Sequence, residues 1–463
     1  MIAIGTLADI VELAGENRRI VSQGISLLRD TLNTGLCALL SVAGIEQDSV
    51  SSQSVVFGLV PRINATGRMG SVDDAVELLL CEDAERAMEL ARRLDALNTQ
   101  RKEIEAVITD EILGKIKSSP LLQHQRMLIV AGEGWHHGVV GIVASKMVER
   151  FGKPCLLISI DEQQARGSGR SVEGFNLVEA ISFCSSRLSR YGGHNQAAGC
   201  SMNKQDVDAF TSELLEYCKT HYDMMPAQTL VIDREIIPSE ITVSNVTALN
   251  QLEPFGEGNP LPVFLLKNCK LEAVNPVGEG KHLRLRFQKG SQSFFAMYFG
   301  MSPRQFPYQT GDLVDLVCNL SLSEYNGEQR VTVKIKDLRF SGLEQEKICE
   351  GKQAYDKYVR GEMVLPEIAD AWAPAREEIA QVYRTLKAWG SIPYGCDASY
   401  VRLCGQTLDY IRIPFILELL LERGLAECKA NGDMPQIELI PRTDKVDITA
   451  SAVYQKIQNL KLV

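Results

Sequence analysis

The segment RMLIVAGEGWHHGVVGIVASKMVERFGKPCLLISI, residues 126–160, decides the fold of the centre of the chain. Its apolar runs RMLIVAG and PCLLISI have the length and composition of buried strands, and GVVGIVASKMVERF between them has the length of a helix. The stretch NLVEAISFCSSRL then adds a second helix. Strands that alternate with helices are typical of an α/β domain, which we place at residues 126–222.

Three further parts are predicted around this α/β domain. Residues 1–82 space their apolar side chains three and four apart, which predicts helices, and residues 83–117 predict one long connecting helix. Residues 228–342 contain short strands separated by Gly, Pro and Asn, which is typical of a small β-barrel. Residues 346–463 return to helices followed by the strand-like PQIELIPR and resemble a winged-helix arrangement. The expected fold class is therefore multidomain, α/β plus β.

One predicted barrel strand, KHLRLRF, divides its side chains between two faces. Leu283, Leu285 and Phe287 fall on one face. Arg284 and Arg286 fall on the other, because successive side chains of a strand point to opposite sides. The alternation predicts an apolar face and an arginine face for this strand.

Composition and charge exclude several classes of protein. No segment has the long uncharged apolar run of a membrane span, and the N-terminus lacks the pattern of a secretory signal, so the cytoplasm is the expected location. The twelve cysteines form no CxxC pair and no dense framework, which signals neither structural zinc nor a disulfide scaffold. The formal net charge of −10 argues against a protein that coats nucleic acid by bulk attraction, so any nucleic-acid contact must be local.

Three glycine-rich segments of the α/β domain could bind an anion. GEGWHHGVVG stands between a strand and a helix, where free backbone amides favour negative charge. QARGSGRSV offers Ser168 and Arg170, and an arginine with hydroxyls and bare backbone suits a phosphate. YGGHNQAAG places His194 after Gly192 and Gly193, whose missing side chains permit close approach of a ligand or of another chain segment.

For each segment alone, an ordinary turn is an equally good interpretation. Because all three are expected in loops at the edges of strands, we expect them to converge on a crevice. The spacing is not that of a dinucleotide fingerprint, which excludes a Rossmann cofactor site, and the adjacent His136 and His137 lack the spacing of metal ligands on a helix. The segment LVPRINATGRMG adds Arg62, Asn64 and Arg68, which either are solvated or contact an anionic strand.

Six segments of the chain resemble, in the same order, the RecJ family of DHH phosphoesterases. They are GTLADIVEL, PRINATGRMGSVDDAVELLL, GWHHGVVGIVASKMVERFGKPCLLIS, GSGRSVEGFNLVEAI, YGGHNQAAG and FGEGNPLPVF. The resemblance covers residues 1 to about 340, and the C-terminal part is similar to the extra domain of longer family members. It implies a 5′-to-3′ exonuclease that removes nucleotides from single-stranded DNA in recombination and repair, with Mn²⁺ or Mg²⁺ held by aspartates and histidines of a catalytic domain.

The resemblance also implies roles for domains and residues. Residues 126–222 are similar to the DHH-associated domain, which closes over the substrate, and residues 228–342 are similar to an oligonucleotide-binding barrel with backbone contacts from its arginine face. The DNA backbone would lie against the glycine pair, with the following histidine at a phosphate, and Arg68 would recognise the 5′ end. The implied nucleic-acid or phosphate contacts are Arg62, Asn64, Arg68, His137, Ser168, Arg170, Gly192, Gly193 and His194, with Arg284 and Arg286 on the barrel.

The chain departs from the family in its catalytic motifs. An aspartate pair with glycine, a lone aspartate and the Asp-His-His motif are absent, and only the fourth motif, GTLADIVEL, is present, with Asp9 as its implied metal ligand. One carboxylate cannot hold two divalent ions, which need several oxygen or nitrogen ligands. We therefore expect residues 1–82 to be the C-terminal remnant of a catalytic domain and the chain to be inactive alone.

The expected partners are single-stranded DNA with a 5′ end, single-strand-binding protein, other repair factors and a separately encoded catalytic half. Two alternatives stay open: a noncatalytic module that binds single-stranded nucleic acid, and a small-nucleotide phosphodiesterase of the same superfamily. The barrel and the C-terminal part favour a longer substrate than a small nucleotide. For residues 346–463, a packing or partner domain is favoured over a DNA-reading one.

Overall fold

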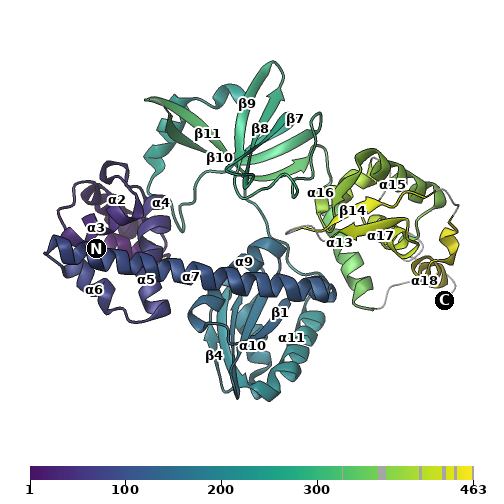
Figure 1. Ribbon diagram of the computed structural model, residues 1–463, viewed down its shortest axis with the longest axis horizontal. Coiled ribbons are helices and arrows are strands. Elements are labelled where there is room, and N and C mark those ends of the chain that lie inside the picture. The colour runs from purple at the N-terminus through teal and green to yellow at the C-terminus, as the bar shows by residue number, and fades with distance from the viewer. Residues whose placement is uncertain (326, 363–371, 406–408, 430–433, 443–445, 461–463) are drawn as a thin grey trace. The chain divides into compact units, whose positions relative to one another are not determined.

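The computed structural model describes residues 1–325, 327–362, 372–405, 409–429, 434–442 and 446–460. The chain divides into two compact units, one of residues 1–230 and 251–261 and the other of residues 231–250 and 262–463 (Figure 1). The multidomain fold class expected from the sequence is confirmed. No helix in the described ranges has the length and apolar content needed to cross a membrane.

The first unit begins with a bundle of helices. Its main helices are α1 (Ile2–Ala8), α2 (Gly15–Arg29), α3 (Thr34–Ala43), α5 (Val60–Met69) and α6 (Asp73–Leu80). The 35-residue helix α7 (Ala84–Ser118) follows, capped by the side chain of Asp83. Leu90 and Leu94 of α7 pack into the core of the bundle, whereas Ile108 and Ile112 pack into the core of the α/β domain. One helix therefore contributes to both cores of this unit.

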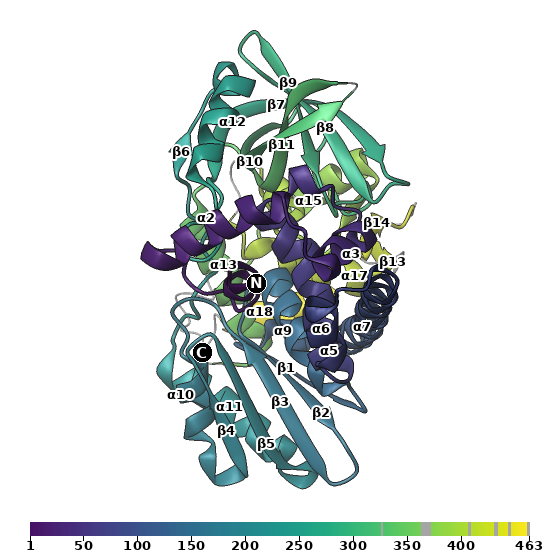
Figure 2. The same cartoon turned by 90° about the vertical axis from the view of Figure 1, so that its left-hand side faces the viewer.

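The α/β domain is a five-stranded sheet with helices on both faces (Figure 2). The spatial order is β1-β2-β3-β5-β4, in which β1 and β2 are parallel and the other neighbours are antiparallel. Helix α9 packs on β2 and β3 on one face of the sheet. On the other face, α10 packs on β5, and α11 packs against α10. The elements are β1 (Leu128–Glu133), α9 (His137–Phe151), β2 (Cys155–Ile160), β3 (Gln164–Arg170), α10 (Leu177–Phe183), β4 (Arg190–Gly193), β5 (Ala197–Asn203) and α11 (Val207–His221).

Two of the predicted glycine-rich loops are strands. QARGSGR forms β3, and YGGHNQAAG forms most of the β4–β5 hairpin, so neither segment stands at the carboxyl edge of a parallel strand. The prediction of loops converging on a crevice is wrong because glycine here serves close packing within strands. A Cβ at Gly167 would lie 2.6 Å from Cys200 Sγ, and a Cβ at Gly169 would lie 2.8 Å from Leu177 Cδ2.

The second unit contains a closed five-stranded barrel. Its strands are β7 (Phe264–Val277), β8 (His282–Lys289), β9 (Gln292–Tyr298), β10 (Leu313–Tyr325) and β11 (Glu328–Phe340). They follow the order β10-β11-β9-β8-β7, and a further β10–β7 pairing closes the barrel. The short strand β6 (Arg234–Glu235) pairs with β7, and α12 (Val243–Leu249) packs on β10 and β11. Leu283, Leu285 and Phe287 are completely buried, as the alternation of KHLRLRF predicts.

The C-terminal part of the second unit has the element order of a winged-helix domain. Its elements are α13 (Gln345–Val359), α15 (Arg376–Trp389), β12 (Ser391–Pro393), α16 (Asp397–Cys404), α17 (Arg412–Glu422), β13 (Ala426–Lys429), β14 (Gln436–Leu439) and α18 (Ala452–Leu460). Helix α17 holds the place of the helix that reads DNA in such folds. Seven of its eleven residues are buried, and Phe415 stacks edge-on against Tyr355 and Tyr358 of α13. This burial favours a packing role over DNA reading.

Arg402 of α16 joins the winged-helix part to the barrel. Its guanidinium pairs with Asp312 through two hydrogen bonds, one of them 3.2 Å between Nη1 and Oδ1. Its Cζ lies 3.3 Å from the ring centroid of Trp389 and 4.8 Å from that of Phe340. The side chains of Arg402 and Asp312 are only 12% and 15% exposed. The two parts of this unit are therefore held together by a nearly buried ion pair.

Candidate nucleic-acid interface

Arg68, Ser168 and Arg170 come together where helix α9 crosses strand β3. Gly141 lets α9 approach the strand, because a Cβ there would lie 3.0 Å from Ser168 Oγ and 3.3 Å from Arg170 Nη2. Gly138, one turn earlier, makes room for α5: a Cβ there would lie 2.5 Å from the carbonyl oxygen of Arg68. The Arg68 guanidinium in turn donates to the Gly138 carbonyl at 3.0 Å. The glycines predicted to favour an anion thus bring two arginines to the start of α9.

The two arginines repel each other. Burial lowers the pKa of Arg170, and the positive charge of Arg68 lowers it further. Burial also lowers the pKa of Arg68, repulsion from Arg101 adds to that effect, and attraction to Glu105 opposes it. An anion bound beside both guanidinium groups would relieve this repulsion and accept charge-assisted hydrogen bonds. The site therefore favours a phosphate group.

A charge network on α7 adjoins this pair, and the sequence reasoning missed it. Glu105, 4% exposed, accepts a hydrogen bond of 3.1 Å from Arg101 Nη1 to its Oε2 and also pairs with Lys146 of α9. The i, i+4 spacing of Arg101 and Glu105 is visible in the sequence, but such pairs are usually solvated. Their burial comes from the packing of α5 and α9 on α7, which no local pattern reveals.

The histidine pair at the start of α9 shapes the turn. His136 Nδ1 accepts a hydrogen bond of 3.2 Å from the Gly138 amide and so caps the helix. His137 Nε2 lies 3.1 Å from Asp161 Oδ2. These contacts favour the turn interpretation for His136. A phosphate contact of His137 stays a prediction and would compete with the carboxylate of Asp161.

Beyond α9, the sheet presents a flat surface. Ser168 and Arg170 point toward α9, and the strand register places Ala197 and Gly199 of β5 and Gly192 of β4 on the same face. A Cβ at Gly192 would meet no atom within 4 Å, and one at Gly199 would meet only a backbone oxygen at 3.4 Å. We call the α9-side surface of β3, β5 and β4 the open sheet face (Figure 2).

The two glycines before His194 differ in what they do. Gly193 has a φ of +146°, and a Cβ there would lie 2.3 Å from the carbonyl oxygen of Ala197, so the hairpin itself requires glycine. Gly192 has no positive φ and no close neighbour, so the fold does not require glycine there. His194 is exposed, and its amide donates to the Ala197 carbonyl at 2.8 Å. Gly192 is thus a place where a missing side chain leaves room for a ligand.

Replacing Gly192 with alanine is expected to change the free energy of unfolding by less than about 0.5 kcal/mol, as at an ordinary surface site. We expect the added methyl group to weaken binding of single-stranded DNA by roughly tenfold, or about 1.4 kcal/mol. Gly193→Ala is the matched control and should destabilise the fold by about 1–3 kcal/mol through backbone strain. Denaturant unfolding and fluorescence anisotropy measure the two quantities. Wild-type DNA affinity in Gly192→Ala would contradict the close approach.

Arg62 and Asn64 lie on the same helix as Arg68 but are placed differently. Arg62 Nε donates to Asp95 Oδ1 at 2.8 Å, and its Nη1 donates to the Gly58 carbonyl at 2.7 Å. This side chain is 15% exposed and ties α5 to α7. Asn64 is half-buried. Contacts of both residues with nucleic acid stay predictions.

Asp9, the implied metal ligand, is exposed at the C-terminal end of α1. In the described part of the chain, no three His, Cys, Asp or Glu side chains are placed to hold a metal ion. Mn²⁺ and Mg²⁺ prefer several oxygen or nitrogen ligands. The described residues therefore do not fit a divalent metal centre.

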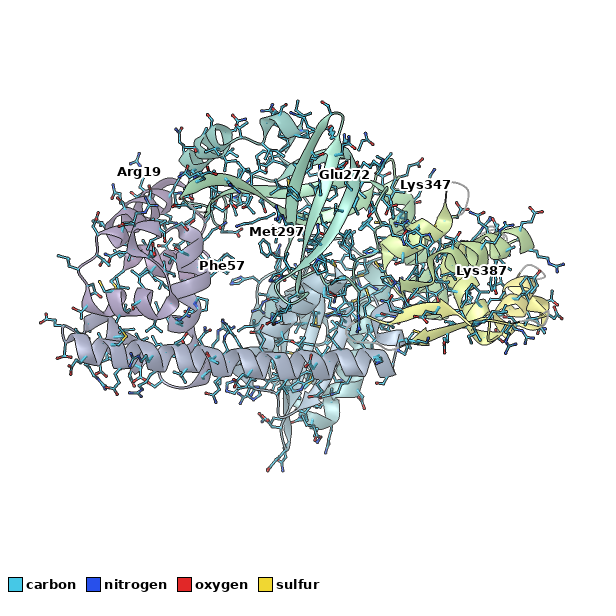
Figure 3. The ribbon with its side chains drawn as sticks, turned by 45° about the horizontal axis from the view of Figure 1, so that its top comes forward. Arg19, Phe57, Glu272, Met297, Lys347 and Lys387 are labelled. Carbon is cyan, nitrogen blue, oxygen red and sulfur yellow. The ribbon has the colours of Figure 1, made fainter. Side chains whose placement is uncertain are left out.

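The barrel carries an arginine and aromatic surface on β8 and β9. Arg284 and Arg286 are exposed, and Phe295, 46% exposed, pairs in register with Arg286. The Cζ atoms of Arg284 and Arg286 lie 4.1 Å and 5.9 Å from the Phe295 ring centroid. Glu272 of β7, labelled in Figure 3, pairs with Arg286 at 3.0 Å. Sequence reasoning missed Phe295, because the two adjacent phenylalanines of QSFFAMY do not show which of them points outward.

Comparison with known proteins matches two domains of the chain to family models. The DHHA1 domain model matches residues 124–220, and the RecJ OB domain model matches residues 232–337. The single-stranded-DNA-specific exonuclease RecJ of Bacillus subtilis is 37% identical over 345 residues, which cover 73% of this chain and 43% of the relative. The relative of the same name from Escherichia coli is 30% identical over 352 residues, covering 73% and 60%.

Solved structures agree with these matches. The crystal structure of RecJ from Thermus thermophilus in complex with Mn²⁺ has a TM-score of 0.63 at 29% identity, covering 74% of this chain and 49% of that one. A structure of RecJ from the same organism with Mg²⁺ also has a TM-score of 0.63, at 30% identity over 74% of this chain and 52% of that one. The chain spans about half the length of the relatives it matches.

A DHHA1 domain followed by a RecJ OB domain defines the class of protein to which this chain belongs. Within that class, this chain belongs to the RecJ family, as the six motifs of the sequence suggested.

Proposed function

We propose that this chain binds single-stranded DNA with a 5′ phosphate and supplies the DHHA1 and OB parts of a RecJ-type 5′-to-3′ exonuclease. The observation that carries the proposal is the approach of Arg68 and Arg170 at the start of α9, beside the open sheet face. Two guanidinium groups and the Ser168 hydroxyl match the terminal phosphate of a strand.

Each of the other surfaces already described offers contacts of its own to single-stranded DNA. Gly192 leaves room for the backbone, and His194 stands exposed beyond it. On the barrel, Phe295 offers a stacking surface for a base, and Arg284 offers a cation for the backbone. Stacking and backbone attraction together bind single strands without reading their sequence.

We infer that the chain by itself does not hydrolyse DNA. Asp9 is exposed, the described residues do not fit a divalent metal centre, and the relatives were solved with Mn²⁺ and Mg²⁺. No hydrolytic step is therefore assigned to residues of this chain.

The helical bundle exposes three large apolar side chains: Phe57, labelled in Figure 3, is 78% exposed, Leu32 is 95% exposed and Leu80 is 74% exposed. From the family resemblance, we propose that a polypeptide carrying the Asp-His-His motif supplies the catalytic part.

Incubation of the purified chain with 5′-labelled single-stranded DNA and Mn²⁺ is expected to release no nucleotides, because one carboxylate cannot assemble a two-metal centre. Addition of a polypeptide bearing the Asp-His-His motif is expected to restore cleavage, and Asp9→Ala should abolish the restored activity. The readout is product release on a denaturing gel. If the chain alone releases nucleotides, and Asp9→Ala abolishes that release, the inference is wrong.

A second candidate is a noncatalytic module that binds single-stranded nucleic acid. The lack of a fitting metal centre among the described residues favours it. The same mixing experiment separates the two functions, since binding without restored cleavage would select the noncatalytic module.

A further inference from the structure

The open sheet face carries a second pair of arginines away from the Arg68–Arg170 site. Arg166 of β3 and Arg190 of β4 both pair in register with Ser201 of β5, one from each side. Side chains two residues apart in a strand point the same way, so Arg166 shares its face with Ser168 and Arg170. By the same register, Arg190 shares the face of Gly192. The two arginines therefore flank Ser201 on the open sheet face.

Both arginines are exposed and available to a ligand. Neither Arg166 nor Arg190 takes part in an ion pair within the described ranges of the chain. By contrast, Arg187, three residues before Arg190, pairs with Glu213 of α11, which packs with α10 against the other face of the sheet. An unpaired arginine on each side of a serine forms a cationic position on an otherwise small-residue surface.

The register sets the distances along this surface. Four residues of strand separate Arg166 from Arg170, which is about 13 Å at the usual rise of about 3.3 Å per residue. On the neighbouring strand β5, the small residues Ser201, Gly199 and Ala197 lie opposite Arg166, Ser168 and Arg170, respectively. This row of small residues has no large side chain to block a backbone that runs along it. A polynucleotide bound at Arg170 would reach Arg166 and Arg190 after more than one phosphate.

We propose that Arg166 and Arg190 form a second phosphate subsite, which holds the backbone of the same single strand downstream of its 5′ end. This inference rests on the proposed function, because it takes the Arg68–Arg170 site as the place of the terminal phosphate. The subsite fixes the direction of the strand, from Arg170 along β5 toward Ser201. It recognises phosphate charge and not base identity.

The test is equilibrium binding of a 5′-phosphorylated dinucleotide and a 5′-phosphorylated tetranucleotide of thymidine across a salt series. The dinucleotide should occupy the Arg68–Arg170 site alone, and the tetranucleotide should also reach the second subsite. The variants are Arg166→Ala, Arg190→Ala and the double variant, with Arg187→Ala as the control that removes a charge from the opposite side. Circular dichroism checks that each variant is folded.

The wild-type chain is expected to bind the tetranucleotide more tightly than the dinucleotide. The double variant should lose this gain while keeping wild-type affinity for the dinucleotide, and its salt slope on the tetranucleotide should fall by about 1.4, or about 0.7 for each lost contact. Arg187→Ala should match the wild type. Wild-type tetranucleotide binding by the double variant would overturn the second subsite alone. No binding of either oligonucleotide by the wild type would overturn the proposed function and the subsite together.

Discussion

Arg170→Ala is expected to weaken binding of 5′-phosphorylated single-stranded DNA by roughly tenfold to a hundredfold, which corresponds to the loss of about 1.5–3 kcal/mol from a hydrogen bond to a charged group. The same change should flatten the dependence of binding on salt, because one phosphate contact is lost. Arg170 stands beside Ser168 and Gly141, close enough to Arg68 for the two charges to repel. Fluorescence anisotropy over a salt series measures both effects.

Loss of folding can be separated from loss of binding in this variant. The pKa of Arg170 is lowered by burial and by Arg68, so the charge, which Arg170 keeps at neutral pH, is less favourable in the folded state than in the unfolded state. Removing the charge should therefore leave the melting temperature equal to or above that of the wild type. Arg170→Lys, which keeps the charge without the planar fork, should recover only part of the affinity. Unchanged affinity and salt slope in Arg170→Ala would refute a phosphate role.

Helices and strands could be predicted from the sequence where apolar residues recur at helical or strand spacing. The apolar spacing of α7 predicts its helix, and the alternation of KHLRLRF correctly separates buried from exposed residues. Strand β3 could not be recognised, because Gly and Ser have low strand propensity and normally mark loops. Its glycines instead admit Cys200 and Leu177, which are distant in sequence. Only tertiary packing reveals that requirement.

Some residues of the candidate site could likewise be predicted from the sequence, and others could not. Ser168, Arg170 and Gly192 belong to motifs that the sequence displays, and the structure places them on one face of the sheet. Glu105 and Arg101 look like an ordinary surface pair, and their importance depends on burial under α5 and α9. Sequence patterns therefore indicate the residues of the open sheet face better than the buried groups packed around them.

Arg402→Ala is expected to destabilise the junction between the barrel and the winged-helix part by about 3–5 kcal/mol, the usual cost of leaving a buried charge without its partner. Asp312 would lose its guanidinium partner and keep only the hydrogen bond of 2.7 Å that the Gln309 amide donates to its Oδ2, and Trp389 and Phe340 would lose a stacked cation. The measurement is hydrogen exchange of the full chain, followed at α16 and at the start of β10. Exchange at both places should rise together.

The matched control removes both charges at once. In Arg402→Met combined with Asp312→Leu, neither partner is left buried and unpaired, so the double variant should lose less stability than Arg402→Ala alone. A double variant that is less stable than either single variant would show that the stacking of Arg402 on Trp389, and not the ion pair, holds the junction. Equal exchange in the wild type and Arg402→Ala would contradict any such role. Because α17 is buried, we expect the winged-helix part to act as an extension of the barrel and not as an independent reader of DNA.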